Sequence, residues 1–280
     1  MIEIKNVHFK HPRAFEPVLN GINLKAERGK LTSILGPNGS GKTTLFKCIS
    51  GLWMPGKGDI VFENGSIVSC SSSKRARIIA VVPQEHEPTF QYSVFDTVLT
   101  GRAAYVGIFS TPSKKDYVKA QRAIEEVGIE HLKDRPYTKI SGGERQLVLI
   151  ARALAQETPV MLFDEPTSHL DYKNQINVLG KIGEIVRLRQ VTAVMTIHDP
   201  NLAMLFSDSV VLVKDGSVVS QGNAHEVINE ANLSAVYGID VDILRVNGTR
   251  VVTPRLKSEG RMTTSREDQM PSDSNEKRSN

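Results

Sequence analysis

The sequence predicts an α/β fold built around a mostly parallel sheet. Short apolar runs at residues 78–84, 160–166 and 192–199 each end at polar residues, which is typical of strands buried on both faces of such a sheet. A glycine-rich stretch, GPNGSGKTT at residues 36–44, lies between a fourth apolar run and a segment with helical spacing. We therefore expect a strand–loop–helix unit at the centre of the fold.

Further strands and a helical insertion are predicted around this core. Residues 2–9 alternate between apolar and polar positions, as a half-buried strand does. Residues 209–222 and 245–252 each hold two short runs around an Asp-Gly or Asn-Gly pair, which indicates β-hairpins. Residues from about 88 to 157 have a helical pattern, most clearly at 144–157, where apolar positions recur at i, i+3, i+4 and i+7. This region is predicted to be a helical insertion in the α/β core.

The last segment differs in composition from the rest of the chain. Residues 257–280 are polar and hold no periodic apolar positions, so we expect them to be disordered. The sequence therefore predicts one domain at residues 1–256, with the helical insertion inside it, followed by a polar tail.

Composition excludes several classes of function. The 35 basic and 31 acidic residues are well mixed, so no nucleic-acid partner is indicated. Two cysteines without CxxC spacing and seven scattered histidines predict neither a disulfide framework nor a zinc site, and they favour a reducing compartment. The first residues lack a signal-peptide core, and no apolar run approaches the ~20 residues of a membrane span. We expect a soluble, cytoplasmic chain.

The stretch GPNGSGKT matches the pattern G-x-x-x-x-G-K-[ST] at Gly36, Gly41, Lys42 and Thr43. Glycines let backbone N–H groups point inward at phosphate oxygens, and the following helix adds its positive dipole end. Lys42 can reach the β- and γ-phosphates, and the Thr43 hydroxyl can ligate Mg²⁺. The sequence predicts a nucleotide phosphate site here. The predicted contacts are Gly36, Pro37, Asn38, Gly39, Ser40, Gly41, Lys42, Thr43 and Thr44.

Two adjacent carboxylates end the apolar run at residues 160–166. A carboxylate at a strand end beside the phosphate loop can hold Mg²⁺, and we assign this role to Asp164. Glu165 is then expected to orient or deprotonate the attacking water, a general-base step that typically contributes 10²–10⁴-fold.

The segment ISGGE at residues 140–144, the signature loop, precedes a helix, and its Ser141 lies 23 positions before Asp164. Small residues at a helix N-terminus form a second anion-binding site. The segment and its spacing resemble the signature motif of ATP-binding cassette (ABC) ATPases, and the resemblance covers residues 1 to about 254. It implies that two copies close head to tail, each signature loop covering the ATP held by the other copy. The implied contacts to the partner's ATP are Ser141, Gly142, Gly143, Glu144 and Asp171.

The same resemblance implies roles for three more residues. Gln84 resembles the glutamine that senses Mg²⁺ and the γ-phosphate, and Asp171 in SHLD belongs to the loop that crosses the dimer interface. His198 resembles the switch histidine that hydrogen-bonds the γ-phosphate. The implied cofactors are ATP and Mg²⁺, with Thr43, Gln84 and Asp164 as metal ligands and Glu165, His198 and Lys42 as catalytic residues.

The implied fold is a P-loop NTPase: a RecA-like core with an antiparallel β subdomain and a helical subdomain specific to ABC proteins. The family usually stacks adenine on an aromatic residue about 25 positions before the first glycine of the phosphate loop, which here is His11. Phe9 and Phe15 are alternatives for this role. The chain also departs from the family pattern in having Glu144 for a commoner glutamine and Leu147 for a frequent arginine.

The resemblance extends to the work that ATP drives. The stretch VPQEHEPTFQYSVFDTVLTGR resembles cassettes of importers for iron–siderophore, haem and cobalamin-type metal chelates. It implies a peripheral ATPase subunit on the cytoplasmic face of the membrane, partnered by a transmembrane permease and, indirectly, by an extracytoplasmic substrate-binding protein. Phe90, Tyr92 and Phe95 are candidates for the groove that receives the permease, and Phe95 is alternatively a core residue of the helical subdomain.

Two other functions are alternatives, and the first of them shares every catalytic motif. One is a soluble ABC-type ATPase of iron–sulfur cluster assembly, and the other is the ATPase subunit of an exporter. A cassette that works on nucleic acid or ribosomes is disfavoured, because such proteins usually carry two cassettes or a long coiled coil, and this sequence shows neither.

Overall fold

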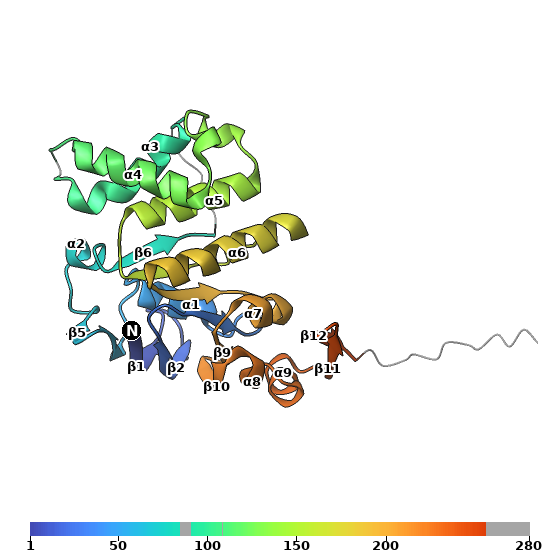
Figure 1. Ribbon diagram of the computed structural model, residues 1–280. Coiled ribbons are helices and arrows are strands. Elements are labelled where there is room, and N and C mark those ends of the chain that lie inside the picture. Colours follow the sequence, from blue (N-terminus) through green and yellow to red (C-terminus); the bar gives the residue numbers. More distant parts are fainter. Residues whose placement is uncertain (85–90, 108, 256–280) are drawn as a thin grey trace, which may run out of the picture.

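A computed structural model describes residues 1–84, 91–107 and 109–255 and contains the predicted parallel sheet (Figure 1). The strand order is β10-β9-β3-β8-β7-β6, and β10 is the one antiparallel member among the described strands of this sheet. The three apolar runs of the sequence become β6, β7 and β8, as predicted. The strands are β3 (Leu31–Leu35), β6 (Ile79–Val82), β7 (Val160–Phe163), β8 (Thr192–Thr196), β9 (Ser209–Lys214) and β10 (Ser217–Asn223).

Alternate residues of each central strand enter different hydrophobic clusters. In β7, Val160 and Leu162 pack into the cluster on the antiparallel-sheet side, whereas Met161 and Phe163 pack into the cluster that includes the helical insertion. Because successive side chains of a strand point to opposite faces, both faces of the sheet are buried, and an uninterrupted apolar run results.

The antiparallel β subdomain pairs its strands in the order β2-β1-β4-β5. Val7 and Ile22, which are opposite each other in β1 and β2, are both fully buried, and they pack with Leu45 and Ile49 of the helix after the phosphate loop. The elements are β1 (Ile2–Phe9), β2 (Leu19–Ala26), β4 (Lys57–Phe62), β5 (Gly65–Ser66), α1 (Lys42–Ile49) and α2 (Ser72–Arg75).

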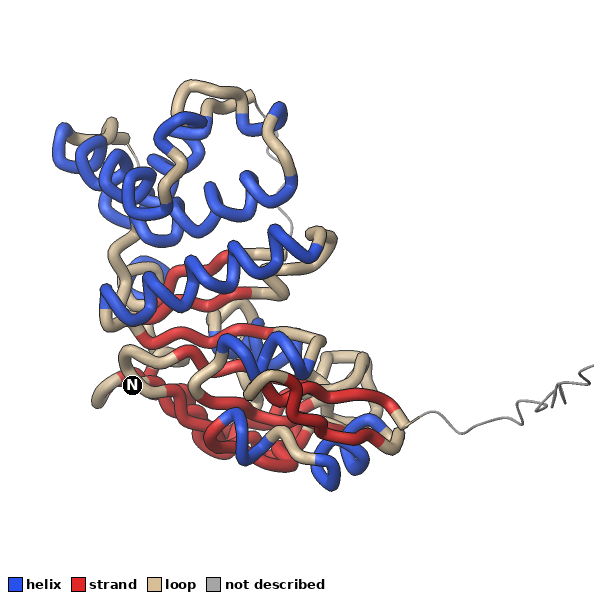
Figure 2. Tube along the Cα trace, turned by 45° about the vertical axis from the view of Figure 1, so that its right-hand side comes forward, coloured by secondary structure: helices blue, strands red, loops and turns tan. Residues whose placement is uncertain are grey.

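The helical subdomain lies beyond β6 at one side of the molecule (Figures 1 and 2). Its core includes Ile124 of α4 and Ile150 of α5, both fully buried. The predicted limits of about 88 and 157 are close to the described helices, although residues 88–90 lie outside the described residues. The elements are α3 (Val94–Leu99), η1 (Thr100–Tyr105), α4 (Lys114–Val127), η2 (Glu130–Leu132), η3 (Tyr137–Lys139) and α5 (Gly142–Ala155).

Both predicted hairpins are present, with left-handed turn residues. Asp215 and Gly216 have φ of 48° and 70°, and Asn247 and Gly248 have φ of 51° and 82°. Such turns match the twist of the flanking strands and explain the Asp-Gly and Asn-Gly pairs. The second hairpin is longer than predicted. It consists of β11 (Val241–Val246) and β12 (Thr249–Pro254) and packs beside α7 (Pro200–Phe206) and α9 (Glu230–Tyr237).

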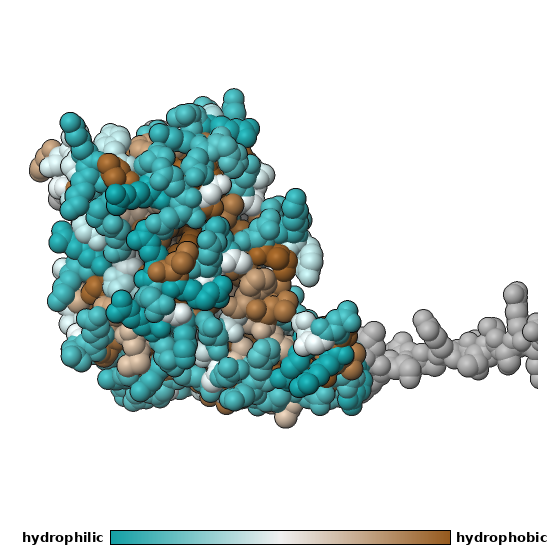
Figure 3. Space-filling view, viewed as in Figure 1, coloured by the Kyte–Doolittle hydropathy of each residue, from teal (hydrophilic) through white to brown (hydrophobic). Residues whose placement is uncertain are grey.

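Two further helices complete the described chain, α6 (Tyr172–Arg189) and α8 (Ala224–Val227). Within the described ranges, no helix is both long enough and apolar enough to cross a membrane. The face shown in Figure 3 is mostly hydrophilic, with apolar side chains gathered in the band between the helical subdomain and the sheet. The predicted tail at residues 257–280 lies outside the described residues, and the proposed domain limits stay a prediction.

Candidate functional site

A cavity of 490 Å³ opens at the carboxyl ends of the parallel strands, where open α/β sheets bind their ligands. The phosphate loop follows β3, Gln84 follows β6, Glu165 follows β7 and His198 follows β8. The fold thus gathers residues that are up to 180 positions apart in the sequence, from 18 to 198. The lining residues are Val18, Asn38, Gly39, Gly41, Lys42, Thr43, Thr44, Gln84, Glu165 and His198.

The phosphate loop requires glycine at two positions for different reasons. Gly41 has φ of 100° at the start of α1, a left-handed conformation that favours glycine. Gly36 has no room for a side chain, because a Cβ there would lie 2.1 Å from the carbonyl oxygen of Val213. The loop therefore packs closely against β9 at Gly36 and continues into α1 after Gly41.

Lys42 holds the phosphate loop together from inside. Its Nζ donates hydrogen bonds to the carbonyl oxygens of Gly36 and Pro37, at 2.8 and 2.9 Å. Burial lowers the pKa of Lys42, and the Glu165 carboxylate opposes this effect. A buried ammonium group beside inward-facing N–H groups is suited to bind the negatively charged oxygens of a phosphate.

Asp164 is a partly buried carboxylate at the end of β7. Burial raises its pKa, while a hydrogen bond from Thr196 Oγ1 to Asp164 Oδ1, at 2.9 Å, lowers it. An ionised carboxylate in such surroundings gains from a nearby cation. Together with the Thr43 hydroxyl in the cavity, it fits the oxygen-only ligand set that Mg²⁺ prefers, which is completed by nucleotide phosphates and water. Asp164 itself is not one of the lining residues.

Glu165 is held by three contacts. Its Oε1 lies 2.6 Å from Nε2 of His198, and its Oε2 accepts a hydrogen bond from Ser168 Oγ at 3.0 Å. Its backbone N–H donates to Thr196 Oγ1 at 2.9 Å, so Thr196 connects the backbone of Glu165 with the carboxylate of Asp164. The φ of Glu165 is 44°, an uncommon conformation for a side chain of this size. The arrangement fixes a carboxylate and an imidazole side by side at the mouth of the phosphate loop.

The signature loop lies outside this cavity. Ser141 caps α5: its Oγ accepts from the Glu144 N–H at 3.3 Å, and the Glu144 carboxylate accepts from the Ser141 N–H at 2.7 Å. The Ser141 backbone and hydroxyl lower the pKa of Glu144. This reciprocal capping box gives a physical role to the glutamate that replaces the commoner glutamine.

The signature loop also contacts the loop that holds Asp171. A Cβ on Gly143 would lie 2.7 Å from Cγ of Asn174, so any other residue there would push the Asn174 side chain aside. Asn174 in turn donates through its backbone N and its Nδ2 to the Asp171 carboxylate, at 2.8 and 3.0 Å. No local pattern in the sequence points to Asn174, because the contact joins two segments that are distant along the chain.

His11 packs into an aromatic cluster. Its ring lies edge to face against Phe9 and Trp53, with centroids 5.0 and 4.9 Å apart, and Phe9 stacks on Trp53. Phe15 is 98% exposed. Neither His11 nor the alternatives Phe9 and Phe15 is among the lining residues of the cavity, so the assignment of adenine stacking stays a prediction. No sequence motif points to Trp53.

The aromatic residues of the helical subdomain differ in their surroundings. Tyr92 is 43% exposed, whereas Phe95 packs against the hydrophobic core and stacks on Tyr117 with a centroid distance of 5.9 Å. The core alternative for Phe95 is therefore confirmed. Phe90 lies outside the described residues.

Comparisons with known proteins agree with this geometry. A family model described as ABC transporter matches residues 19–168. A probable iron chelatin transport ATP-binding protein of Helicobacter pylori is 38% identical over 245 residues, which cover 87% of this chain and 95% of that protein. The hemin import ATP-binding protein HmuV of Bordetella avium is 36% identical, with 87% and 96% coverage.

Solved structures extend the similarity to three dimensions. A proposed metal-chelate type ABC transporter, in an inward-facing conformation, has a TM-score of 0.80 at 30% identity and covers 91% of this chain and 98% of that one. A dimeric ATP-binding cassette, MJ0796 bound to ADP and Pi, has a TM-score of 0.69 at 27% identity, with 80% and 99% coverage. The chain belongs to the ABC transporter family as an ATP-binding protein, and proteins of this kind hydrolyse ATP to drive transport.

Proposed function

We propose that the chain is the ATP-hydrolysing subunit of an importer for an iron chelate, either a siderophore complex or haem, and that it works with a separate permease and an extracytoplasmic binding protein. The contact between Glu165 and His198 beside the phosphate loop carries the catalytic part of the proposal. The relatives with iron chelatin and hemin transport names support the class of cargo. Cobalamin is a further cargo of the same chelate class.

In the proposed reaction the phosphate loop and Lys42 bind the β- and γ-phosphates. Nucleotide oxygens would replace the Gly36 and Pro37 carbonyls as acceptors for Lys42, so the lysine needs little movement. Mg²⁺, when bound by Thr43, Gln84 and Asp164, supplies positive charge to the phosphate oxygens. Lys42 adds a second positive charge, which stabilises the developing negative charge of the transferred group.

Glu165 is the proposed general base. Its carboxylate accepts the proton of the attacking water while His198 keeps it oriented through the 2.6 Å contact. When the γ-phosphate is present, His198 Nε2–H is the group placed to turn towards it, and Ser168 then remains as the partner that holds Glu165. The position of the His198 side chain would therefore depend on whether the γ-phosphate is present.

The proposed active unit is a dimer in which each signature loop covers the ATP of the other copy. One observation supports this proposal: Ser141 and its glycines lie outside the nucleotide cavity of their own chain. The structurally similar dimeric cassette supports it as well. Asp171, held by Asn174 beside the signature loop, is proposed to contact the partner copy.

The permease is proposed to dock on the helical subdomain at Tyr92, whose side chain is partly exposed at the start of α3. The cytoplasmic face of the membrane is the proposed location, because ATP and a membrane-embedded partner are both available there. The absence of a membrane-spanning helix from the described residues is compatible with a peripheral subunit.

The decisive experiment retains the tagged Glu165→Gln variant on a resin in the presence of ATP and captures partners from detergent-solubilised membranes and cytosol of the source cell. The control is Lys42→Ala, which is expected not to bind ATP and therefore not to form the ATP-bound dimer. Recovery of a polytopic membrane protein supports the importer. Its binding protein is then screened with iron–siderophore complexes, haem and cobalamin. Recovery of soluble iron–sulfur assembly proteins alone would overturn the transport proposal and leave the ATPase standing.

A further inference from the structure

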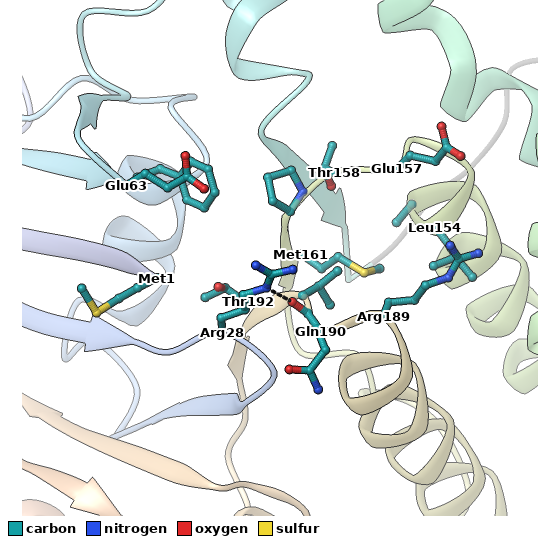
Figure 4. Close-up of a pocket in the computed structure, with 14 residues that line it drawn as sticks. Met1, Arg28, Glu63, Leu154, Glu157, Thr158, Met161, Arg189, Gln190 and Thr192 are labelled. Atoms are coloured by element: carbon teal, nitrogen blue, oxygen red, sulfur yellow. Dashed lines mark hydrogen bonds between the residues drawn. The ribbon is translucent and has the colours of Figure 1, made fainter.

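A second cavity, of 380 Å³, lies at the amino-terminal ends of the parallel strands, opposite to the nucleotide cavity (Figure 4). It opens just before β7, at Thr158, and at Thr192, the first residue of β8, whereas the nucleotide cavity opens beyond the last residues of both strands. Its size falls within the range of about 300–1,000 Å³ that small-molecule sites occupy.

Three parts of the fold meet at this cavity. Figure 4 shows Met1 and Glu63 of the antiparallel subdomain on one side, and Leu154 and Glu157 from the end of α5 on the other. Arg28, from the turn between β2 and β3, lies between them. A ligand here would therefore touch the antiparallel subdomain, the core and the helical subdomain together.

The inner wall is apolar and well packed. Leu154, Met161 and Val191 line the cavity and are only 6%, 1% and 8% exposed. The Thr192 side chain also lines it, and the Thr192 hydroxyl oxygen is buried with no hydrogen-bond partner among the described residues. Because this oxygen exposes less than 1 Å², a ligand in the cavity does not reach it, and recognition rests on the other lining groups.

Two of the four charged side chains around the cavity already have partners. Glu157 accepts hydrogen bonds from Arg102, at 3.3 Å, and from Lys119. Arg189 forms a bidentate pair with Glu126 of α4. These four contacts neutralise the charges on the side of the helical subdomain.

The other two charged side chains, Arg28 and Glu63, are opposite in sign and have no ion-pair partner among the described residues. Arg28 donates through Nε to the Gln190 carbonyl at 3.0 Å, but its two terminal nitrogens have no partner within the described ranges of the chain. The Glu63 carboxylate likewise has no ion pair or side-chain hydrogen bond there. The cavity thus offers one cationic group, one anionic group and an apolar wall.

From this combination we propose that the cavity binds a small zwitterion, an amino acid with an apolar side chain. Its carboxylate pairs with the terminal nitrogens of Arg28, its ammonium group pairs with Glu63, and its side chain packs on Leu154, Met161 and Val191. Both charges of the ligand are then met by opposite charges of exposed side chains, and each contact is a charge-assisted hydrogen bond, which is stronger than a neutral one.

Binding has a consequence for ATP hydrolysis, which rests on the proposed dimer. Helix α5 has 14 residues and is therefore about 21 Å long. Its first turn is capped by Ser141 of the signature loop, and its last turn supplies Leu154 to the cavity. A ligand that binds this arrangement of the three parts stabilises it against any other arrangement, so it opposes movement of the signature loop onto the partner's ATP. The bound amino acid is a negative effector.

The binding test uses the purified full chain without nucleotide and the free L-amino acids leucine, isoleucine, valine, methionine and phenylalanine as probes. Thermal unfolding does not depend on ATP or on a permease, so it tests this inference separately from the proposed function. At about five times its Kd the ligand is expected to raise the Tm by about 2–4 °C. If none of the five probes raises the Tm, the proposal is overturned.

Two variants and a control locate the site. Arg28→Met and Glu63→Gln are expected to weaken binding about tenfold each, because each removes a charged hydrogen-bond partner. Glu226→Gln, an exposed glutamate of α8, is the matched control and should keep the full shift. A full shift in Arg28→Met or Glu63→Gln contradicts the site.

Hydrolysis gives the second readout. The probe that raises the Tm should lower the ATPase rate of the wild-type chain and should leave the rate of Glu63→Gln unchanged at the same concentration. Glu63 lies in neither the nucleotide cavity nor the signature loop, so its basal rate is expected to equal that of the wild type. A Tm shift without any change of the ATPase rate would retain the binding site and overturn the negative effect.

Discussion

His198 Nε2 lies 2.6 Å from Glu165 Oε1, although the two residues end different strands and are 33 positions apart. Because a carboxylate has no proton to give, the imidazole N–H is the donor. Thr196 connects the backbone of Glu165 with the side chain of Asp164. The end of β8 therefore positions both carboxylates at the end of β7.

The first prediction concerns Glu165→Gln, which keeps the shape of the side chain and removes its basicity. We expect ATP to bind with nearly unchanged affinity, while kcat falls by about 10²–10⁴-fold and an ATP-bound dimer accumulates. Steady-state ATPase assays and size-exclusion chromatography measure the two effects. Lys42→Ala is the contrasting variant, because it should lose nucleotide affinity instead. Near-normal turnover of Glu165→Gln would mean that Glu165 is not the general base.

Asp164→Asn tests the effect of the raised pKa of Asp164. Between pH 3.8 and that raised pKa the folded chain binds more protons than the unfolded chain, so the free energy of unfolding falls as the pH rises through this window. At neutral pH the ionised group is therefore unfavourable in the free chain. We expect Asp164→Asn to raise the Tm without nucleotide and to abolish Mg²⁺-dependent hydrolysis. Asp134→Asn, at an exposed site, should change neither, and a lower Tm in Asp164→Asn would contradict the prediction.

Ser141→Ala separates capping from the proposed contact with the partner's ATP. Loss of an N-cap typically costs about 0.5–2 kcal/mol, and Ser93 caps α3 in the same subdomain by accepting a hydrogen bond from the Asp96 N–H, as Ser141 accepts one from the Glu144 N–H. Ser141→Ala and Ser93→Ala should therefore lose similar stability in thermal unfolding, but only Ser141→Ala should lower the ATPase rate by more than tenfold. Equal ATPase rates in the two variants would show that Ser141 does not contact the ATP of the partner copy.

Asp116 gives a pH prediction for the helical subdomain. Hydrogen bonds from Ser113, and then from Arg102, lower the pKa of Asp116 from 3.8 to about 2. Stability from this group is fully present above pH 3.8 and is lost as the pH falls towards 2. Asp116→Asn should cost about 3 kcal/mol at neutral pH, since it leaves the buried Arg102 without its main partner. It should also reduce the dependence of stability on pH between 4 and 2.

The measurement for Asp116 is urea unfolding followed by circular dichroism at several pH values. Asp96→Asn serves as the control, because Asp96 also accepts a hydrogen bond from a capping serine but is not paired with a buried arginine. If both variants respond equally to pH, the low pKa of Asp116 does not stabilise the fold.

Tyr92→Glu tests the proposed docking of the permease. A charge at this partly exposed position should uncouple transport, so cargo uptake in cells is lost while basal ATP hydrolysis of the purified chain is unchanged. Leu244→Glu, at a similarly exposed position on the C-terminal hairpin, should keep uptake. Loss of ATP binding in Tyr92→Glu would mean that the residue acts within the cassette itself.

The sequence by itself determined the local parts of this protein. Runs of apolar residues predicted β6, β7 and β8, because strands buried on both faces need no polar side. The Asp-Gly and Asn-Gly pairs predicted the two hairpin turns, because these residues tolerate left-handed backbone. The phosphate loop could also be predicted from a local segment, because its glycines, lysine and threonine provide the groups for phosphate binding within nine residues.

Only the tertiary structure decided which distant residues meet. The contact between Glu165 and His198, the contact of Gly143 with Asn174 and the aromatic cluster of His11 with Trp53 depend on strand order and on the packing of the helical subdomain, which have no local pattern. The second cavity is the clearest case. It is formed by turns at residues 28, 63, 157 and 190, and each of these turns alone is an ordinary connection between two elements.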